Sequence, residues 1–443
     1  MNCPHKKHFL FFMFCSFVVF LSVSLIGCTS NSKAKTAPKV VKIWHWMSDR
    51  DAAFQELAKR YEKQAGIKID FELYAPSDAY TQKIRASAQT DTLPDIFGIL
   101  GEKRVFASFI KAGYVFDLTE EMNKDNSAWK LRFFSKALAV NEFAQGNSYG
   151  VELGIYGVPI DATNIQMLYN KDLLKSAGWD PDNPPRTWDE FLAANKMLKE
   201  KGIQGLVSGW GEIWMIDCLA SNYAFNIMGE DKVLDTIKGK VPYTDPDWIK
   251  VFDLFGQMRD ENVLASGVVT MVNKTAEQLF ANNRAAFAFN GSWCVNVYKG
   301  MNPDLNCGVM MPPRVSDKHP MVIWGGAGSS FMVNSHSLVR QKAIEFLKWL
   351  TDEEQQTFLV ARTNNLPANK QCAINMPKIN QEFASGMDHA THPSAWDASE
   401  FLMVIETYTR GIQSIILGEK TSEQVAAETQ AVKERELSRQ QNI

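Results

Sequence analysis

The sequence has few of the residues that build metal centres and disulfide networks. Its 443 residues include seven cysteines and seven histidines. None of them forms a Cys-x-x-Cys motif or a Cys/His cluster with zinc-site spacing, and no Ser/His/Asp or Cys/His catalytic motif is present. We therefore expect no cofactor, no metal and no catalysis. The sequence leaves open whether the four cysteines in the body of the chain pair or are buried thiols: Cys218, Cys294, Cys307 and Cys372.

The chain also lacks a block of charge of one sign. Lys and Arg number 47 against 50 Asp and Glu, so the formal net charge is -3. Nucleic-acid-binding proteins concentrate basic residues on one surface, so we do not expect a nucleic-acid partner. Aromatic residues are plentiful by contrast, and the twelve tryptophans supply flat apolar faces for a core or for a binding site.

One long apolar run stands out, at residues 9–21, directly after the basic residues Lys6 and Lys7. It is short for a membrane span of ~20 residues and has the layout of a secretory signal. Residues 25–28 read LIGC and resemble a bacterial lipobox, which is cut before its cysteine. We expect residues 1–27 to be the signal peptide, Cys28 the lipidated residue and 28–37 a flexible tether. The product would be lipid-anchored outside the cytoplasm, on the outer face of the membrane or in the periplasm. The alternative is an uncleaved anchor helix.

The remaining chain is too long for one hydrophobic core, which favours two domains. Strands are expected at 40–44, 67–71 and 94–99, alternating with helices at about 50–63, 80–88 and 106–112. This alternation predicts βαβ units and an α/β fold with a parallel sheet. Ligands of such sheets lie outside the carboxyl ends of the strands. Four residues would then lie at the mouth of a cleft: Trp44, His45, Trp46 and Glu102.

The most informative stretch is 156–191. The Gly-Val-Pro at 157–159 should end a strand, because proline lacks a donor. Asn170 or Asp172 can cap a short helix that Gly178 closes, and Thr187 with Glu190 forms a capping box for a longer one. The segments LYNKDLL (168–174), AG (177–178), PP (184–185) and TWDE (187–190) resemble the signature region of the extracellular solute-binding proteins of the maltose and multiple-sugar type, which serve ABC importers.

A second signature of this family resembles residues 280–293, FANNRAAFAFNGSW. Asn283 stands where the family has glycine, and asparagine tolerates the left-handed conformation better than most residues. The resemblance implies that Trp293 stacks on the ligand. The glycine-rich segment 324–328 lacks the Lys-Ser/Thr of a phosphate-binding loop, and a strand is expected to follow it from 329.

The resemblance covers essentially the whole mature chain and implies a site shared by two lobes. Tryptophans would stack on sugar rings, and polar groups would bind hydroxyls. The candidate ligand-binding residues are Trp44, His45, Trp46, Glu102, Thr163, Asn164, Trp210, Glu212, Trp214, Asn290, Trp293, Trp324 and Asp397.

The implied fold is the two-lobed α/β periplasmic-binding-protein type II fold, in which each lobe is a βα sheet sandwich and crossover hinges join the lobes. Lobe 1 is expected to comprise 38–159 and 329–367, and lobe 2 160–328 and 368–443. The implied function is capture of a sugar or oligosaccharide by a monomer and delivery to an ABC permease.

Two other functions stay open. The same fold could bind a polyamine, an anion, a metal or a peptide. A lipid-anchored glycoside hydrolase would need two carboxylates ~5–9 Å apart, and nothing in the sequence favours such a pair. The sequence does not identify the sugar, its length or the permease.

Overall fold

Alternating apolar residues form the first strand, β1 (Val40–His45), in which Val41, Ile43 and His45 are buried. It pairs in parallel with β2 (Lys68–Leu73) and β3 (Ile96–Phe97), as the sequence predicts. The connecting helices are α1 (Asp51–Ala65) and α2 (Ser77–Gln89). The computed structural model describes residues 40–441, so the predicted signal peptide, Cys28 and the tether lie outside the described residues.

The main sheet is mixed rather than parallel, which corrects the expectation from the sequence. Its β10 strand runs antiparallel to both neighbours, β3 and β6, and β6 is antiparallel to β8. The order is β2, β1, β3, β10 (Ile323–Val333), β6 (Val158–Asn170), β8 (Ala285–Gly291) and β7 (Gln204–Val207). β9 (Cys307–Met310) and β11 (Leu366–Pro367) pair with β6, and β12 (Ala390–Thr391) pairs with β10. A separate pair is formed by β4 (Glu142–Phe143) and β5 (Gly154–Ile155).

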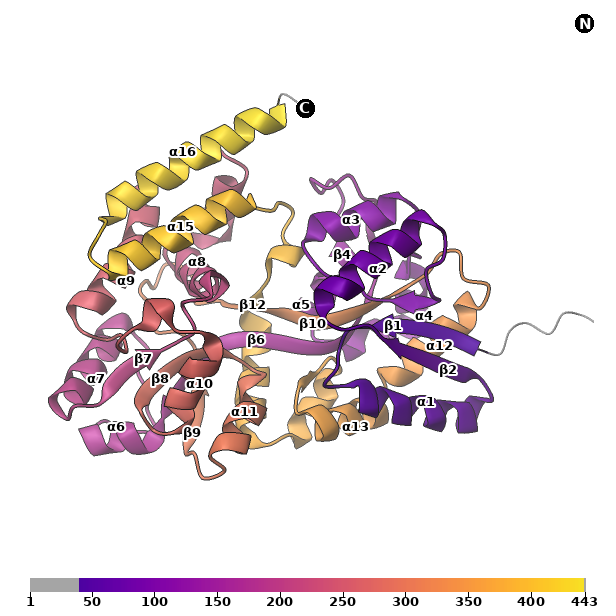
Figure 1. Ribbon diagram of the computed structural model, residues 1–443, viewed down its shortest axis with the longest axis horizontal. Helices are drawn as coiled ribbons and strands as arrows, with labels where there is room; N and C mark the ends of the chain where they lie inside the picture. Colours follow the sequence, from indigo (N-terminus) through magenta and orange to yellow (C-terminus); the bar gives the residue numbers. More distant parts are fainter. Residues whose placement is uncertain (1–39, 442–443) are drawn as a thin grey trace, which may run out of the picture. The chain divides into compact units, whose positions relative to one another are not determined.

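Helices cover the sheet on both faces. Around β1 and β2, Figure 1 shows α1 and α13 on one side and α2 and α3 on the other. The helices of this region are α3 (Lys103–Lys111), α4 (Thr119–Ser127), α5 (Ser135–Ala139), α12 (Arg340–Leu350) and α13 (Glu353–Thr363). The remaining helices are α6 (Lys171–Ala177), α7 (Trp188–Glu200), α8 (Ile213–Ile237), α9 (Pro246–Asp260), α10 (Asn273–Ala281), α11 (Cys294–Met301), α14 (Lys378–Ser385), α15 (Leu402–Ile416) and α16 (Ser422–Gln441).

Three strands pass between two groups of buried side chains. The buried side chains around β1 to β3 are called the first core. Those around β7 and β8 are called the second core. On β6, Ile160 packs in the first core and Ala162 in the second. The same change occurs along β10 between residues 323 and 331, and around β11 between residues 366 and 368. β6, β10 and the segment around β11 therefore pass between the cores. The lobe boundaries given above stay a prediction.

Proline does not end the strand at 157–159 as predicted. Pro159 is the second residue of β6 and lies opposite Ser330 of β10. The register of β10 shifts on either side of Ser329, which marks a β-bulge. Proline is tolerated near a strand start and at a bulge, because no ladder hydrogen bond is required of it there. One long strand, β6, thus begins at Val158 and runs through the position where the sequence predicted a strand end.

The predicted helix signals in the signature region are confirmed. The Asn170 side chain accepts hydrogen bonds from the backbone N–H groups of Asp172 and Leu173, and Gly178 ends α6 with φ 93°. Thr187 and Glu190 form the capping box of α7. Asn283, standing where the family has glycine, has φ 57°. Asp352 is extended and is the N-cap residue of α13, so α12 and α13 are separate helices.

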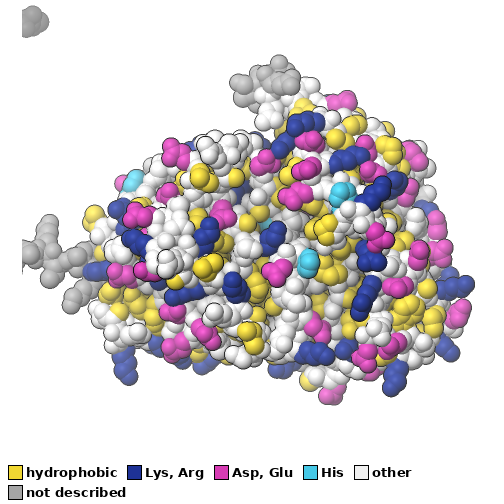
Figure 2. Space-filling model, turned by 180° about the vertical axis from the view of Figure 1, so that it is seen from behind, with side chains coloured by type: hydrophobic (Ala, Val, Ile, Leu, Met, Phe, Trp, Pro, Cys, Tyr) yellow, Lys and Arg dark blue, Asp and Glu magenta, His cyan; other side chains and the backbone are white. Residues whose placement is uncertain are grey.

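Cys218, Cys294, Cys307 and Cys372 are free cysteines, which answers the question the sequence left open. Charged side chains of both signs are interspersed over the face shown in Figure 2, with small apolar areas between them.

Candidate functional site

His45 lies inside the first core and not at the mouth of a cleft. Its ring is fully buried, edge-on to Phe54 and Phe71 at centroid distances of 5.2 and 5.7 Å. Its Nε2 is 3.2 Å from a carboxylate oxygen of Asp51. Burial lowers the pKa of His45 and favours the neutral ring. We therefore remove His45 from the candidate site.

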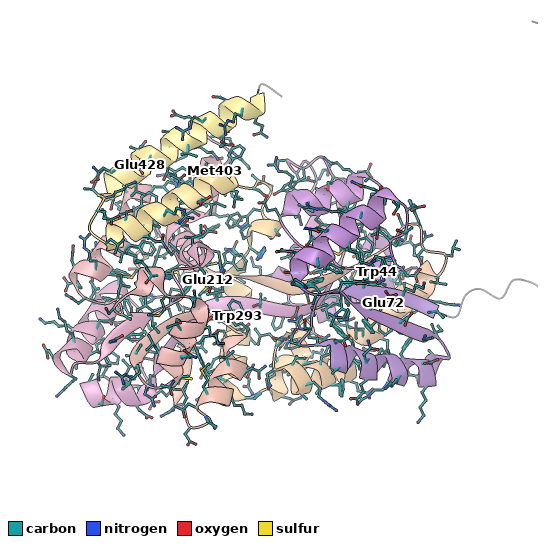
Figure 3. The ribbon with its side chains drawn as sticks, in the orientation of Figure 1. Trp44, Glu72, Glu212, Trp293, Met403 and Glu428 are labelled. Carbon is teal, nitrogen blue, oxygen red and sulfur yellow. The ribbon has the colours of Figure 1, made fainter. Side chains whose placement is uncertain are left out.

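Trp44, at the end of β1, is half-buried and engaged by its neighbours. Its ring meets Tyr74 edge-on at 5.2 Å, and the ammonium of Lys83 lies 4.2 Å from its centroid. Figure 3 places Trp44 and Glu72 together in the β1–β2 region, away from Glu212 and Trp293. The Trp44 ring is thus engaged in contacts at this edge of the sheet and offers little free surface for stacking on a ligand.

Trp46 is better placed than Trp44 to contact a ligand. It lies 5.1 Å from the Tyr80 ring, and its indole covers Gly98, where a Cβ atom would come within 2.2 Å of the ring. A glycine at 98 is therefore required for this position of Trp46. Together with Asp49 and Arg50, Trp46 lines a shallow hollow of about 410 Å³ at the end of β1.

On the second core, Trp214 and Trp293 form a pair, with ring centroids 6.0 Å apart and an interplanar angle of 45°. Trp214 is 40% exposed and Trp293 is half-buried. Glu212 orients Trp214 by accepting its indole N–H at 3.2 Å. The other carboxylate oxygen of Glu212 accepts the backbone N–H of Asn273, the first residue of α10, at 2.8 Å. Glu212 and Trp293 lie close together in Figure 3.

Gly291 and Asn290 hold the turn that carries Trp293. The indole lies over Gly291, where a Cβ atom would be 2.0 Å from a ring carbon. Asn290 is buried, and its amide donates to Glu277 at 3.1 Å and to the Tyr298 hydroxyl at 3.3 Å. Asn290 is thus a support of the turn, and no part of its side chain is left for a ligand.

Thr163 reaches the same turn from β6. Its hydroxyl is 3.3 Å from the hydroxyl of Ser292, the residue before Trp293. Thr163 is half-buried and therefore lies beside the turn that carries Trp293 with part of its surface exposed.

Asn164 and Trp210, both predicted as ligand contacts, are enclosed in the protein. Asn164 donates to the Phe383 carbonyl at 2.8 Å and accepts from the Gln166 side chain at 3.0 Å. Trp210 has no exposed surface and packs edge-on against Phe255 at 5.6 Å. Buried polar groups that satisfy one another act as structural contacts.

Glu102 and Trp324, which are far apart in the sequence, line one cavity of about 440 Å³. Glu102 is exposed directly before α3, and Trp324 lies on β10 with its ring centroid 4.2 Å from that of His392. The cavity is bounded by the start of α3, by α8 and α15, and by residues 392–400. Its lining thus joins the start of α3, a helix packed in the first core, to helices of the second core.

One face of α8 connects this cavity to the tryptophan pair. Trp214, Asp217 and Ser221 are spaced by three and four residues, so they share a helix face. Asp217 and Ser221 line the cavity, and Trp214 belongs to the pair. Helix spacing therefore places Trp214 one turn before the cavity-lining Asp217.

Asp397 links the loop at residues 147–149 to the loop at residues 397–399. One of its carboxylate oxygens is 2.8 Å from the Lys238 ammonium, and its carbonyl accepts hydrogen bonds from the backbone and hydroxyl of Ser148. Next to it, the hydroxyls of Tyr149 and Ser399 are 2.6 Å apart. These contacts join residues 147–149, beside the first core, to residues 397–399, beside the second.

Lys103 is a buried cation that the sequence did not point to. The residue is 3% exposed, and its ammonium donates to the carbonyls of Val140 at 2.6 Å and Glu142 at 2.7 Å. Burial lowers the pKa of Lys103 to about 7. Burial, together with the Lys103 charge, lowers the pKa of His392 to about 3. No local pattern marks a lysine at the start of a helix as buried.

Asp217 and Tyr408 were also missed. The Tyr408 hydroxyl donates to Asp217, as does Ser221 at 3.3 Å. Asp217 could have been found, since it lies one helical turn after Trp214. Tyr408 comes from α15, and its approach to α8 depends on tertiary packing.

Residues 56–391 match the family model described as bacterial extracellular solute-binding protein, which is more than half of the chain. The chain belongs to this family.

Curated relatives of this solute-binding protein include two named for sugars. The multiple sugar-binding protein of Streptococcus mutans is 23% identical over 341 residues, which are 74% of this chain and 76% of the relative. The melibiose/raffinose/stachyose-binding protein of Bacillus subtilis is 25% identical over 349 residues, 76% of each chain.

Among solved structures, the apo form of RafE from Streptococcus pneumoniae superposes with a TM-score of 0.72 at 18% identity, covering 89% of this chain and 97% of that one. Together with the mixed sheet, this likeness shows that the solute-binding protein has the two-lobed α/β fold of the periplasmic-binding type.

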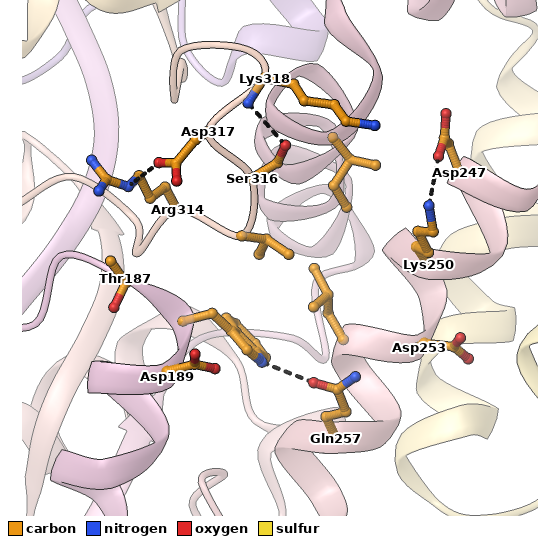
Figure 4. A pocket seen from close by; sticks show the side chains of 14 residues that line it. Thr187, Asp189, Asp247, Lys250, Asp253, Gln257, Arg314, Ser316, Asp317 and Lys318 are labelled. Atoms are coloured by element: carbon orange, nitrogen blue, oxygen red, sulfur yellow. Dashed lines mark hydrogen bonds and ion pairs between the residues drawn. The ribbon is translucent and has the colours of Figure 1, made fainter.

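A further hollow, of about 580 Å³, lies apart from the candidate residues (Figure 4). Its polar groups bind one another: Trp188 donates to Gln257 at 2.8 Å, and Arg314 pairs with Asp317 at 2.9 Å. None of the candidate ligand-binding residues lines it, so we do not assign the solute to it.

Within residues 40–441 of this solute-binding protein, no group of three or more His, Cys, Asp or Glu side chains is arranged to hold a metal ion. Over the same residues, no helix is long and apolar enough to cross a membrane.

Proposed function

We propose that this protein captures a sugar or oligosaccharide in the cleft that runs along α8 and delivers it to the permease of an ABC importer. The observation that carries the proposal is the Trp214–Trp293 pair, whose rings are 6.0 Å apart. Glu212 and Gly291 fix the two indoles in place. The sugar-named relatives support the same function.

The chemistry of the cleft fits a carbohydrate. Indole faces stack on the apolar faces of sugar rings, and carboxylates accept hydrogen bonds from hydroxyls. We assign ligand contact to Trp46, Glu102, Thr163, Glu212, Trp214, Trp293 and Trp324. Trp44 and Asp397 are placed at its edges.

We further propose that the lobes close on the sugar by bending where β6, β10 and β11 pass between the cores. A ligand shifts the open–closed equilibrium only as far as it binds one state better than the other. The cavity is lined by Glu102 and Lys103 at the start of α3, a helix that packs in the first core, and by residues of the second core, so a sugar bound there would contact both sides. Closure would then present a different surface to the permease.

We propose that the protein is anchored to the membrane through the lipobox-like residues 25–28. We expect a monomer with a diacylated Cys28, because two acyl chains give stable membrane attachment. Cys28→Ser should move the protein from the membrane fraction to the soluble fraction. Unchanged fractionation would favour the uncleaved helix.

Titration calorimetry with mono- and oligosaccharides tests sugar capture, followed by chromatography of the sugar after overnight incubation. We expect saturable binding of at least one sugar, which is recovered intact. Binding of only a polyamine, anion, metal or peptide would show that the solute is not a sugar. Loss of the sugar into products would favour the glycoside hydrolase.

A further inference from the structure

The cavity lined by Asp217, one helical turn after Trp214, has walls unlike those of an ordinary hydroxyl-binding pocket. It extends from Glu102 and Trp324 into the helices of the second core and is lined by apolar as well as polar groups. Its aromatic members come from α9, β10, α15 and the loops at 243 and 396: Tyr243, Trp248, Trp324, Trp396 and Tyr408. Aromatic faces attract cations through their quadrupole.

Three carboxylates line the same cavity, and one of them is neutralised by the protein. Glu400 lies 2.7 Å from the ammonium of Lys433 and accepts the Tyr243 hydroxyl at 2.8 Å. This buried pair satisfies Glu400.

The other two carboxylates, Asp217 and Glu102, have no cationic partner among residues 40–441. One oxygen of Asp217 accepts the hydroxyls of Tyr408 and Ser221. Its second oxygen has no hydrogen-bond partner within the same described range. Glu102 is exposed opposite, at the start of α3.

The positive groups in the wall do not compensate these charges. Lys103 directs its ammonium to the carbonyls of Val140 and Glu142. His392 is neutral at physiological pH, because its pKa is held at about 3. The cavity therefore combines aromatic side chains with two acidic groups that have no cationic partner among the described residues. Burial raises the pKa of Asp217, and a cation bound beside it would favour its charged form.

We propose that this cavity is a subsite for a positively charged amino group, so that the preferred ligand of the cleft is an amino sugar or an oligosaccharide that carries one. The inference rests on the proposed sugar-binding function and narrows its ligand class. The amino group lies between Asp217 and Glu102, with the sugar ring against the aromatic wall.

Matched ligands that differ only at one substituent test the subsite. The β-1,4-linked trimers of glucosamine, N-acetylglucosamine and glucose have the same linkage and length, and only the first carries ammonium groups. Glucosamine and galactosamine, against glucose and galactose, extend the comparison to single rings. We expect an amino ligand to bind about tenfold or more tightly than its neutral counterpart in calorimetry.

Asp217→Asn tests the residue assignment. The amide keeps an oxygen that can still accept from Tyr408 and Ser221, so the local fold should be retained. We expect the ratio of amino-ligand to neutral-ligand affinity to fall several-fold. Glu102→Gln, on the exposed side, should lower the ratio as well and serves if Asp217→Asn does not fold. Asp253→Asn, in the hollow of Figure 4, should leave both affinities unchanged.

The outcomes distinguish failure of the amino-group subsite from failure of the proposed sugar-binding function. A neutral sugar that binds as tightly as its amino counterpart overturns the subsite and leaves the sugar-binding proposal standing. An unchanged ratio in both Asp217→Asn and Glu102→Gln overturns the residue assignment. Binding of no sugar in the panel overturns both.

Discussion

Arg50 lies 2.7 Å from Asp161, joining the loop after β1 to β6 at the point where that strand passes between the cores. The guanidinium also donates to the Ser329 hydroxyl of β10 at 3.0 Å. With its amide oxygen turned toward Arg50, Asn365 accepts from Nε at 3.0 Å, directly before β11. One arginine therefore contacts all three crossing segments.

Removing this arginine should destabilise the protein. In Arg50→Met the Asp161 carboxylate, whose side chain is 10% exposed, would lose its cation. Breaking one partner of a buried pair costs about 3–5 kcal/mol, and we expect the lower end because Arg50 is 16% exposed. Urea unfolding measures the loss. Arg410→Met, which breaks an exposed pair with Glu406, should cost below about 1 kcal/mol. Equal losses in the two variants would contradict the account.

Trp293→Ala should abolish sugar binding, since it removes one of the paired stacking faces. The expected loss in affinity is at least tenfold, measured by titration calorimetry. Trp179→Ala is the matched control, because Trp179 is a half-buried tryptophan beside α6 that bonds to the Asn183 carbonyl. If binding survived in Trp293→Ala while the melting temperature fell, Trp293 would be a core residue and the site would lie elsewhere.

Gly291→Ala should weaken binding without touching the ligand. The added methyl would meet the Trp293 ring at 2.0 Å, so the indole must move. Gly300→Ala provides the comparison, because a Cβ atom at residue 300 in α11 has no neighbour within 4 Å. Alanine in a helix interior is more favourable than glycine, so this control should retain binding and gain up to about 1 kcal/mol of stability. Full affinity in Gly291→Ala would show that the indole position is not needed.

Lys103 should give the stability a distinctive pH dependence. Its pKa is about 7 in the folded protein, against an ordinary value of ~10.4 in the unfolded chain. Between these values the unfolded chain keeps a proton that the folded protein has released, so stability rises with pH. The slope is at most about 1.4 kcal/mol per pH unit, and below pH 7 the contribution is constant.

Urea unfolding of Lys103→Met and the parent protein at pH 6.5, 8 and 9.5 measures this slope. The free-energy difference, parent minus variant, should increase with pH. For Lys111→Met, at the exposed end of α3, the free energy of unfolding should change with pH as it does in the parent protein. A difference that stays flat for Lys103→Met would mean that the amine keeps its proton in the folded state.

The sequence predicted local structure well wherever a short-range rule applies. Asn170, Gly178, Thr187 and Asn283 adopt the predicted cap or left-handed conformations, because each depends on neighbours a few residues away. The antiparallel course of β10 was missed. Strand direction at a crossover depends on pairing between residues more than a hundred positions apart.

The candidate site was predicted less completely, because residue type and strand-end position do not determine burial. His45, Asn164, Trp210 and Asn290 all occupy suitable positions along the chain, yet their side chains point into cores or satisfied polar contacts. The tryptophan pair was predicted only as two separate candidates. Its geometry depends on Gly291 and Glu212, which act from different elements.

A thermal-shift screen of the purified protein tests the central claim most directly, with sugars against amino acids, polyamines and anions, run in parallel on Trp293→Ala. A ligand at a hundredfold excess over its Kd stabilises the folded state by ~2.7 kcal/mol, which produces a clear rise in Tm. We predict that at least one sugar raises the Tm of the parent protein and not that of Trp293→Ala. A rise with the control ligands alone, or an equal rise in both proteins, would contradict a sugar site at this pair.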